Sequence, residues 1–304
     1  MDRKRPAVWI IFICVILSGQ VEAAVGSKKK TPERGRNVLL ITIDTLRADR
    51  LSCYDDRHVQ TPVLDGLAGQ GIRFTRAFAH TPTTLPSHAN ILTGVLPLYH
   101  GIHENGTFVL HADQLTLAEL LRDKGYATAA FVGAYPVDSR FGLDQGFDLY
   151  DDDYRSLGSG RLASVERRAE SVVEGAQQWL QAQESPWFLW VHCYDPHDPY
   201  SPPEPFRTQY ADRPYDGEVA YVDRALGPLV QYLKGSGLME STLVVVTGDH
   251  GESLGEHGEE RHGYLAYNSA LWIPLIIAGP GITPGTVDTY VSHCDIFPTV
   301  CDWL

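Results

Sequence analysis

The chain has 304 residues, of which 43% are hydrophobic and 21% are charged, and its formal net charge is −13 at pH 7. This content is enough for one large core or two modest domains. The acidic balance argues against a nucleic-acid binder, which needs a basic surface to replace the counterions of the phosphates. An anionic ligand would therefore need a local positive feature, such as a bound metal ion.

The N-terminus has the pattern of a secretory signal peptide. A basic segment at residues 3–5 precedes an apolar run at residues 7–17, which is about half the length that a bilayer span requires. The VEA sequence at residues 21–23 resembles a small-residue cleavage site. We therefore expect a signal peptide over residues 1–23, a flexible leader over 24–36, and a secreted or periplasmic protein without a stable membrane span. An uncleaved N-terminal anchor is the alternative.

The cysteines that remain after such a cleavage form no CxxC pair. Export permits disulfides, but the lack of CxxC argues against a thiolate zinc site. The spacing of Cys294 and Cys301 is compatible with one helix face, and their pairing cannot be read from the sequence. We expect buried, reduced thiols at Cys53, Cys193, Cys294 and Cys301.

Apolar runs of strand length alternate with helical patterns from residue 37 onward. Helix starts are indicated by Thr61-Pro62 and by the capping box from Thr116 to Glu119. This alternation predicts an α/β protein with a largely parallel central sheet, covered by helices on both faces. We expect strands at residues 37–44, 127–132, 187–192, 243–247 and 274–278, helices at 164–183 and 216–233, and a surface loop at 201–215.

Polar side chains follow several of the predicted strands. Asp44 ends the first one, Asp249 and His250 follow the strand at 243–247, and His197 comes a few residues after a third. In open α/β sheets ligands bind beyond the carboxyl ends of the strands, so we expect these residues to meet. Two carboxylates and one imidazole suit Zn, Mn or Ca. For Asp44 alone, the capping of a helix is the alternative.

Two histidine-rich segments add further candidates. The sequence GDHGESLGEHGEERHG packs three histidines among four glutamates in a Gly-rich loop, and HCYDPHDPY is a turn that its prolines restrain. A solvated charged loop and an Asx-Pro turn are the structural alternatives. The additional candidates for the site, or for a second metal, are His197, His262, His257 and Asp195.

The stretch HTPTTLPSHANILTG poses the question of a nucleophile. We expect Thr84 to be the N-cap of a helix, at the positive end where backbone N–H groups attract an anion. A metal bound to its hydroxyl oxygen would convert it to an alkoxide. Ser87 is expected to point elsewhere, and Thr81 and Thr83 to precede the cap. An ordinary capping threonine is the alternative.

From about residue 36 to 304 the chain resembles the sulfatase branch of the alkaline-phosphatase superfamily. The resemblance rests on LLITIDTLRADRLSCYD, TLPSHANILTG, the turn from His192 to His197, VVVTGDHGESLGEHG, HGYLAYNSALWIPLII and DIFPTV. It implies a three-layer fold with a mixed, largely parallel central sheet, and one catalytic domain over residues 37–304. Relatives usually continue into a C-terminal subdomain, which we expect to be absent or truncated here.

The resemblance also implies roles for the motif positions. Asp44, Asp249 and His250 correspond to metal ligands, and Thr84 occupies the nucleophile position and would itself bind the metal. His88 stands where an arginine closes the sulfatase signature, and with the helix start it would hold the non-bridging oxygens.

Three further positions complete the implied site. Asn105 corresponds to an asparagine that contacts the anion. His197 corresponds to a histidine on the ester or leaving group, and His262 stands where many relatives have a lysine near the leaving oxygen. Either His197 or His262 would protonate that oxygen. Asn105 also begins an NGT sequon, and we expect it to be unmodified because a glycan would block the site.

The chain departs from the family pattern in ways that bear on chemistry. Thr84 stands where sulfatases of the formylglycine type have Cys or Ser, while Thr45 and His250 replace a carboxylate and an amide. The softer set favours Zn or Mn over Ca. A threonyl ester is easier to release as phosphate than as sulfate.

We therefore expect a secreted, metal-dependent hydrolase of anionic phosphate or sulfate esters, with phosphoesters favoured, acting on a small molecule, glycan or lipid. An arylsulfatase-like sulfuric ester hydrolase and a non-catalytic metal- or anion-binding relative are the alternatives.

Overall fold

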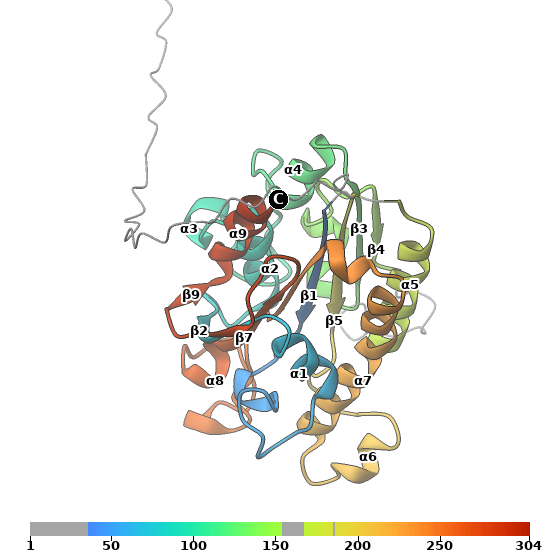
Figure 1. Cartoon of the computed structure of the whole chain (residues 1–304). Helices are drawn as coiled ribbons and strands as arrows, with labels where there is room; N and C mark the ends of the chain where they lie inside the picture. The colour runs from blue at the N-terminus through green and yellow to red at the C-terminus, as the bar shows by residue number, and fades with distance from the viewer. Residues whose placement is uncertain (1–35, 154–166, 185) are drawn as a thin grey trace, which may run out of the picture. The chain divides into compact units, whose positions relative to one another are not determined.

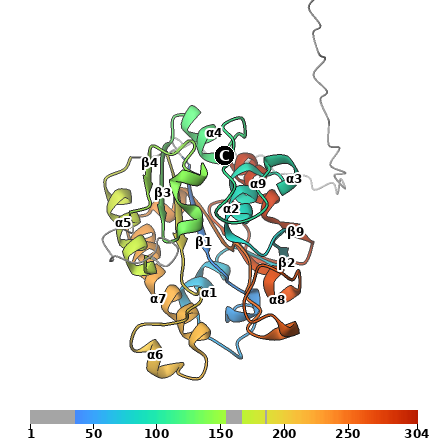
Figure 2. The ribbon, with the colours of Figure 1, turned by 180° about the vertical axis from the view of Figure 1, so that it is seen from behind.

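The computed structural model describes residues 36–153, 167–184 and 186–304 (Figure 1). The described residues form a nine-stranded sheet with the order β4-β3-β5-β1-β6-β7-β2-β8, and β9 pairs with β2. Neighbours from β4 to β6 are parallel, whereas β7 is antiparallel to both β6 and β2. Figure 2 shows β1 from behind, between β3 and β4 on one side and β2 and β9 on the other. The strands are β1 (Asn37–Ile43), β2 (Ile72–Phe78), β3 (Ala127–Val132), β4 (Leu149–Asp151), β5 (Trp187–Cys193), β6 (Thr242–Gly248), β7 (Trp272–Ala278), β8 (Gly285–Val287) and β9 (Val291–Ser292).

Helices cover both faces of the sheet, as the side chains of β1 illustrate. Successive side chains of a strand point to opposite faces. Leu39 and Ile41 pack in a core with α1, α5 and α7, whereas Val38 and Leu40 pack in a second core with α2, α4 and α9. The predicted arrangement of a sheet between helical layers is therefore confirmed. The helices are α1 (Pro62–Ala68), α2 (Thr84–Thr93), α3 (Pro97–His100), α4 (Leu117–Asp123), α5 (Ala169–Gln181), α6 (Phe206–Gln209), α7 (Pro214–Gly235), α8 (Asn268–Leu271) and α9 (Ile296–Trp303).

The five predicted strands are present. The one predicted at 127–132 coincides with β3, and the other four end within two residues of their predicted bounds. The helix predicted at 216–233 is α7, which extends two residues further at each end. The helix predicted at 164–183 corresponds to α5, and residues 164–166 of that prediction lie outside the described part of the chain.

Two segments differ from the prediction. The strand β2 was not predicted, because its sequence IRFTRAF carries two arginines and most of its side chains are only half-buried. The expectation of a plain surface loop at 201–215 was wrong, since this segment contains α6. Phe206 and Tyr210 are buried in the core that contains α7, which explains why the segment is ordered as a helical turn.

The predicted helix starts are correct in position, but the acceptors of their first backbone N–H groups differ between the two helices. The capping box that begins at Thr116 is formed. In α1, Pro62 is the first residue as predicted, but the hydroxyl of Thr61 donates to Asp65 and makes no capping bond. Asp223 of α7 instead accepts hydrogen bonds from two backbone N–H groups of the first turn. A side chain from a distant helix therefore completes this N-terminus.

The four cysteines of the described residues are free. Cys193 is buried as expected, Cys53 and Cys294 are half-buried, and Cys301 is exposed, so the expectation of burial was wrong for Cys301. Within residues 36–304, leaving out the undescribed positions, no helix combines the length and apolar character that crossing a bilayer requires. The predicted signal peptide lies outside the described residues.

Candidate active site

The site is built where two parallel neighbours, β1 and β6, end side by side. Their last residues are paired in register, so Asp44 and Asp249 leave the sheet at the same edge, and His250 follows. Thr45 has a positive φ of 52°, which is uncommon for a β-branched residue. Its backbone N–H donates to Oδ1 of Asp249 at 3.0 Å. The turn after β1 is thereby joined to the turn after β6.

Asp44, Asp249 and His250 form a compact, fully buried cluster. Their ligand atoms all lie within 4.8 Å of one another. Nε2 of His250 is 3.5 Å from Oδ2 of Asp249 and 3.9 Å from Oδ1 of Asp44. Nδ1 of His250 faces the carbonyl oxygen of Gly251 at 3.0 Å, so Nδ1 carries the proton and Nε2 keeps a lone pair. Two carboxylates and an unprotonated imidazole nitrogen are a donor set that divalent cations bind.

The electrostatics of the cluster also fit a cation. Oδ1 of Asp249 accepts from two backbone N–H groups, but its buried Oδ2 has no hydrogen-bond partner among the described residues. Burial raises the pKa of Asp249 and lowers the pKa of His250 well below its ordinary value, because each charged form loses its hydration. A buried carboxylate oxygen without a donor is costly unless positive charge lies nearby.

Thr84 lies beside this cluster at the start of α2. Its buried Oγ1 is 3.4 Å from Nε2 of His250. The N-cap of α2 is Thr83, which has extended backbone angles, so the prediction that Thr84 is the N-cap was wrong by one residue. Ser87 points elsewhere, as predicted, and donates to the carbonyl oxygen of Thr81 at 3.1 Å.

Asn105 reaches the same helix start from a turn. Its Oδ1 accepts a hydrogen bond from the backbone N–H of Leu85 at 2.8 Å. The residue therefore lies next to Thr84, where the implied contact with an anion would occur. One of the N–H groups that we expected to attract an anion is already occupied by this side chain.

His88 lies beneath Thr84 and is fully buried. Its Nδ1 donates to the carbonyl oxygen of Thr84 at 2.8 Å, and its Nε2 is 3.1 Å from Oγ1 of Thr42. Burial lowers the pKa of His88, which favours the neutral ring. Both ring nitrogens are used inside the protein. The geometry therefore favours support of the first turn of α2 and not the direct contact with anion oxygens that the sequence analysis expected.

A buried network that the sequence analysis missed lies behind the cluster. Oγ1 of Thr42 accepts from Nε1 of Trp190 at 2.9 Å and lies 3.2 Å from Nδ1 of His192. Because Nδ1 of His88 carries a proton, its Nε2 accepts the proton of Thr42, and His192 then donates through Nδ1. Nε2 of His192 is left with a lone pair 3.8 Å from Oδ2 of Asp44. The strand register, which pairs residues 42 and 192, creates this arrangement.

His197 and His262 extend the site outward. The ring of His262 is 4.4 Å from that of His250 and 5.2 Å from that of His197, measured between centroids. Nδ1 of His262 is 3.1 Å from Oε1 of Glu252, whereas Nδ1 of His197 is 2.7 Å from the carbonyl oxygen of Asp198. Burial lowers the pKa of His197 to about 4. The two rings line a cavity of about 700 Å³, together with Arg261, Tyr264 and Leu265.

The candidates for a second metal do not join the cluster. Oδ1 of Asp195 accepts from Arg168 at 2.6 Å and Oδ2 from the backbone N–H of Ala169 at 2.9 Å, which anchors the start of α5. His257 is exposed and stacks on Tyr267, with the centroids 3.8 Å apart. The geometry gives these two residues structural contacts and no shared ligand position.

The fold is a mixed sheet between helical layers. A carboxylate–imidazole cluster lies at the ends of its parallel strands, and a hydroxyl at a helix start lies beside this cluster. Together these features define an α/β protein of the alkaline-phosphatase class. The model of the sulfatase family matches residues 36–304. The chain belongs to the sulfatase family.

Named relatives and solved structures agree with this assignment. The ulvan-active sulfatase of Formosa agariphila is 27% identical over 311 residues, covering 87% of this chain and 60% of that protein. Human arylsulfatase A is also 27% identical, covering 88% of this chain and 64% of its own length. The chain thus spans 60% to 64% of these relatives. The crystal structure of a phosphonate monoester hydrolase of Agrobacterium radiobacter superposes with a TM-score of 0.75 at 25% identity, covering 88% of this chain and 73% of that one.

Proposed function

We propose that residues 37–304 act as a metal-dependent hydrolase that cleaves phosphate or sulfate esters, with the hydroxyl of Thr84 as the nucleophile. The observation that carries this proposal is the 3.4 Å between Oγ1 of Thr84 and Nε2 of His250, which places a hydroxyl at the edge of the ligand cluster. Membership of the sulfatase family, and likeness to a phosphonate monoester hydrolase, support an ester-bond hydrolase.

Asp44, Asp249 and His250 would hold the cation, and Oγ1 of Thr84 would complete the set. A divalent cation supplies Lewis acidity, which lowers the pKa of a bound hydroxyl and stabilises negative charge on phosphoryl or sulfuryl oxygens. The imidazole nitrogen favours Zn or Mn over Ca. Thr45 supports this preference, because its hydroxyl donates to the carbonyl oxygen of Pro196 at 2.5 Å and so adds no hard ligand to the cluster.

The remaining residues act on the substrate by position. Thr84 attacks the phosphorus or sulfur atom in line with the leaving oxygen. Asn105 is proposed to contact a non-bridging oxygen through its amide nitrogen, since its Oδ1 is held by the start of α2. His88 holds the first turn of that helix through the carbonyl oxygen of Thr84. The leaving oxygen faces the cavity that His197 and His262 line, and one of them protonates it.

Phosphoesters are the favoured substrates. Water can release a threonyl phosphate by attack at phosphorus, which restores the Thr84 oxygen. A threonyl sulfate would need a second attack at sulfur, whereas an aldehyde hydrate expels sulfate by elimination. Sulfuric ester hydrolysis is the second candidate, and the relatives named arylsulfatase A and choline-sulfatase favour it. In either case the substrate is an anionic ester of a small molecule, glycan or lipid.

The proposal is tested by metal analysis of the purified protein and by a paired panel of aryl sulfates and aryl phosphate mono- and diesters. We expect one equivalent of Zn or Mn, and faster turnover of phosphates than of sulfates. Turnover of sulfates alone would favour a sulfuric ester hydrolase. Bound metal without turnover of any ester would favour the non-catalytic alternative.

We also propose that the chain is exported and cleaved after Ala23. The basic segment at residues 3–5 and the apolar run at residues 7–17 support this proposal. Mass spectrometry of the N-terminal peptide from an exported sample is the test. A mature protein that begins at Ala24 is expected, and a chain that retains Met1 outside the cytoplasm would contradict cleavage.

A further inference from the structure

We propose that a second cavity, next to the candidate active site, binds an uncharged ring of the leaving group, one ring beyond the ring that carries the ester. The inference rests on the proposed function, because it names the part of the substrate that the protein recognises. The cavity has a volume of about 420 Å³. Sites for small molecules span roughly 300–1,000 Å³, so a single ring can be held there.

The second cavity adjoins the cavity that His197 and His262 line, because Glu260 is a lining residue of both. The chain around Glu260 is held in a loop, since the backbone N–H of Ser253 donates to the carbonyl oxygen of Arg261 at 3.0 Å. This loop separates the two cavities. A leaving group whose first ring lies beside His197 and His262 can therefore continue past Glu260 into the second cavity.

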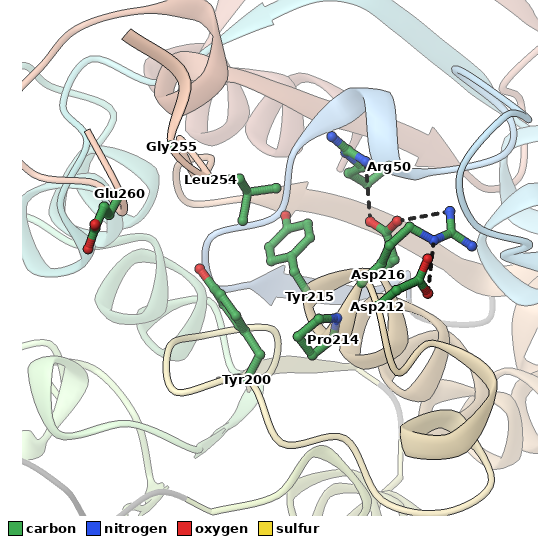
Figure 3. A pocket seen from close by; sticks show the side chains of 10 residues that line it. Arg50, Tyr200, Asp212, Pro214, Tyr215, Asp216, Leu254, Gly255 and Glu260 are labelled. Carbon is green, nitrogen blue, oxygen red and sulfur yellow. Dashed lines mark hydrogen bonds and ion pairs between the residues drawn. The ribbon is translucent and has the colours of Figure 1, made fainter. Parts of the chain in front are cut away.

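Apolar groups form one part of the second cavity. The rings of Tyr200 and Tyr215 meet edge to face there, with centroids 5.5 Å apart, and Leu254 lies beside them (Figure 3). Both hydroxyls are used inside the protein: Tyr200 donates to Glu252 at 2.8 Å, and Tyr215 donates to the carbonyl oxygen of Thr45 at 2.7 Å. The aromatic rings, and not their hydroxyls, are therefore available to a ligand. Such rings pack well against the apolar face or edge of another ring.

The charged groups of the second cavity disfavour an anion. Figure 3 shows Arg50 and Asp216 on one side of the tyrosine rings and Glu260 on the other. The buried carboxylate of Asp216 lies between two guanidinium groups, at 3.3 Å from Nη1 of Arg50 and 3.3 Å from Nη1 of Arg213. The other two carboxylates of the lining, Asp212 and Glu260, are exposed. Because they repel negative charge, an uncharged ring fits this cavity better than a ring that carries a second phosphate or sulfate.

The backbone at Leu254 supports this assignment and provides its test. Leu254 has a positive φ of 53°, which is uncommon for a bulky residue, and strained positions of this kind cluster at binding sites. Glycine adopts such a φ without strain, so Leu254→Gly removes a side chain from the cavity and leaves the backbone conformation accessible. His257 has a φ of 57° in the same loop and lines a different cavity. His257→Gly is therefore the matched control.

The experiment compares three aryl phosphates on the full chain with Zn²⁺ or Mn²⁺: para-methoxyphenyl, para-benzyloxyphenyl and para-(β-glucosyloxy)phenyl phosphate. Their leaving phenols are similar in acidity, so differences in kcat/KM report the second ring. We expect a two-ring probe to exceed the methoxy probe about tenfold or more, mainly through a lower KM. A larger gain for the glucosyl probe identifies the ring as a sugar, and a larger gain for the benzyl probe as an aryl group. No gain for either would overturn the proposal.

Two variants of Leu254 locate the second ring. Leu254→Gly removes a wall of the cavity and Leu254→Trp fills the cavity, so both should reduce the ratio of the two-ring probe to the methoxy probe to about twofold or less. His257→Gly should keep the ratio of the unaltered protein. The use of a ratio cancels any loss that affects both probes equally. A ratio that both Leu254 variants leave unchanged would place the second ring elsewhere and contradict the proposal.

The charge of the distal ring is tested by para-(carboxybenzyloxy)phenyl phosphate. The unaltered protein should turn it over at least about threefold less efficiently than the benzyloxy probe, because Asp212 and Glu260 repel the carboxylate. Asp212→Lys should remove or reverse this difference. Asp302→Lys makes the same change of charge at an exposed residue that lines neither cavity, and it should leave the difference in place. A preference of the unaltered protein for the carboxylated probe would refute the uncharged ring.

A second readout does not depend on turnover. Saturation-transfer NMR with para-benzyloxyphenol and phenyl β-glucoside should show contact of the distal ring with the unaltered protein and with His257→Gly, and loss of that contact in Leu254→Trp. If no ester is turned over but this contact is seen, the proposed function fails and the assignment of the cavity stands. If esters are turned over without this contact and without a gain from the second ring, the assignment of the cavity fails and the proposed function stands.

Discussion

Oγ1 of Thr84 lies 3.4 Å from Nε2 of His250, although 166 positions of sequence separate the two residues. The contact exists because α2 starts where β6 ends, so that a helix-start hydroxyl meets a histidine after a buried strand. The hydroxyl of Thr84 is buried and lies beside an imidazole nitrogen whose cluster includes two carboxylates.

The first prediction concerns Asp249→Asn. The amide oxygen can still accept from the backbone N–H groups of Thr45 and His250, while the charge that burial disfavours is removed. In the presence of a chelator we expect the variant to be as stable as the unaltered protein, or about 1 kcal/mol more stable. Zn²⁺ or Mn²⁺ at 100 times its Kd should stabilise the unaltered protein by about 2.7 kcal/mol and the variant hardly at all. Urea unfolding with and without metal measures both effects, and an equal gain in the two proteins would contradict the ligand assignment.

The second prediction concerns Arg47→Met. Arg47 is buried, donates to Asp49 at 2.8 Å and to the carbonyl oxygen of Glu252 at 2.9 Å, and pairs with Glu256. Methionine keeps much of the apolar volume but leaves these acceptors without their donor. We expect a loss of roughly 2–4 kcal/mol in the free energy of unfolding.

Arg57→Met is the control for that loss. Arg57 pairs with Asp55 at the surface and is 78% exposed, so its removal should lower the free energy of unfolding far less than removal of Arg47 does. Urea unfolding of both variants under the same conditions is the measurement. Equal losses at the two positions would show that the buried contacts of Arg47 contribute no more to the free energy of unfolding than a surface ion pair does.

The third prediction is a pH dependence of stability at Asp223. Burial raises the pKa of Asp223 to about 6, even though two backbone N–H groups of α1 favour its charged form. The unfolded value is about 3.9, so the folded state binds the proton more tightly. The contribution to stability is fully present below about pH 4 and is lost as pH rises through 6. It amounts to roughly 3 kcal/mol at most.

Asp223→Asn isolates this effect. The amide cannot titrate and still accepts a hydrogen bond from the first turn of α1. Relative to the unaltered protein, the variant should therefore gain stability between pH 4 and pH 6.5. Urea unfolding of both proteins across this range measures the difference, in which the other titrating groups cancel. A difference that is constant with pH would refute the raised pKa of Asp223.

The fourth prediction separates the two roles of Asn105. Asn105→Ala leaves the backbone N–H of Leu85 without its acceptor and should cost about 1 kcal/mol of stability. Asn105→Asp keeps that acceptor and adds a negative charge beside the proposed anion site. We expect it to preserve stability and to lower kcat/KM for an anionic ester by about tenfold or more. Unchanged kcat/KM in Asn105→Asp would place the substrate elsewhere.

Thr107→Ala tests the sequon without disturbing this contact. Its hydroxyl donates to Glu104, and that pair is exposed. Because we expect Asn105 to be unmodified, Thr107→Ala should differ in mass from the unaltered protein only by the difference between threonine and alanine. Its activity should equal that of the unaltered protein. A glycan on Asn105, detected in its peptide mass, would contradict the role of that side chain in the site.

The sequence was sufficient for the parts of the fold that short-range pattern determines. Continuous apolar runs identified β1, β3, β5, β6 and β7, because strands buried on both faces need apolar side chains throughout. The strand β2 was missed since it is half-buried and carries Arg73 and Arg76. The sequence predicted Thr84 as the N-cap of α2, whereas the N-cap is Thr83. Consecutive threonines give no local signal that separates the two positions.

The sequence also predicted the ligand cluster of the candidate site, but not the contacts that support it. Asp44, Asp249 and His250 could be grouped because carboxyl ends of parallel strands share one edge of a sheet. The pairing of Thr42 with His192, and of Glu252 with His262 and Tyr200, depends on strand register and loop conformation. Neither can be read from residues that lie far apart in the chain. Family resemblance supplied roles for single positions, and the structure shows the side chains that orient them.

The central claim, that Thr84 is the attacking group, is tested most directly by Thr84→Ala, with Thr83→Ala as the control. Kinetics on the best aryl ester and metal analysis are measured on the same samples. We predict that Thr84→Ala keeps most of its metal affinity and loses about 10⁴-fold or more in kcat, while Thr83→Ala stays within a few-fold of the unaltered protein. A Thr84→Ala protein that binds metal and turns over the ester at the unaltered rate would contradict the account.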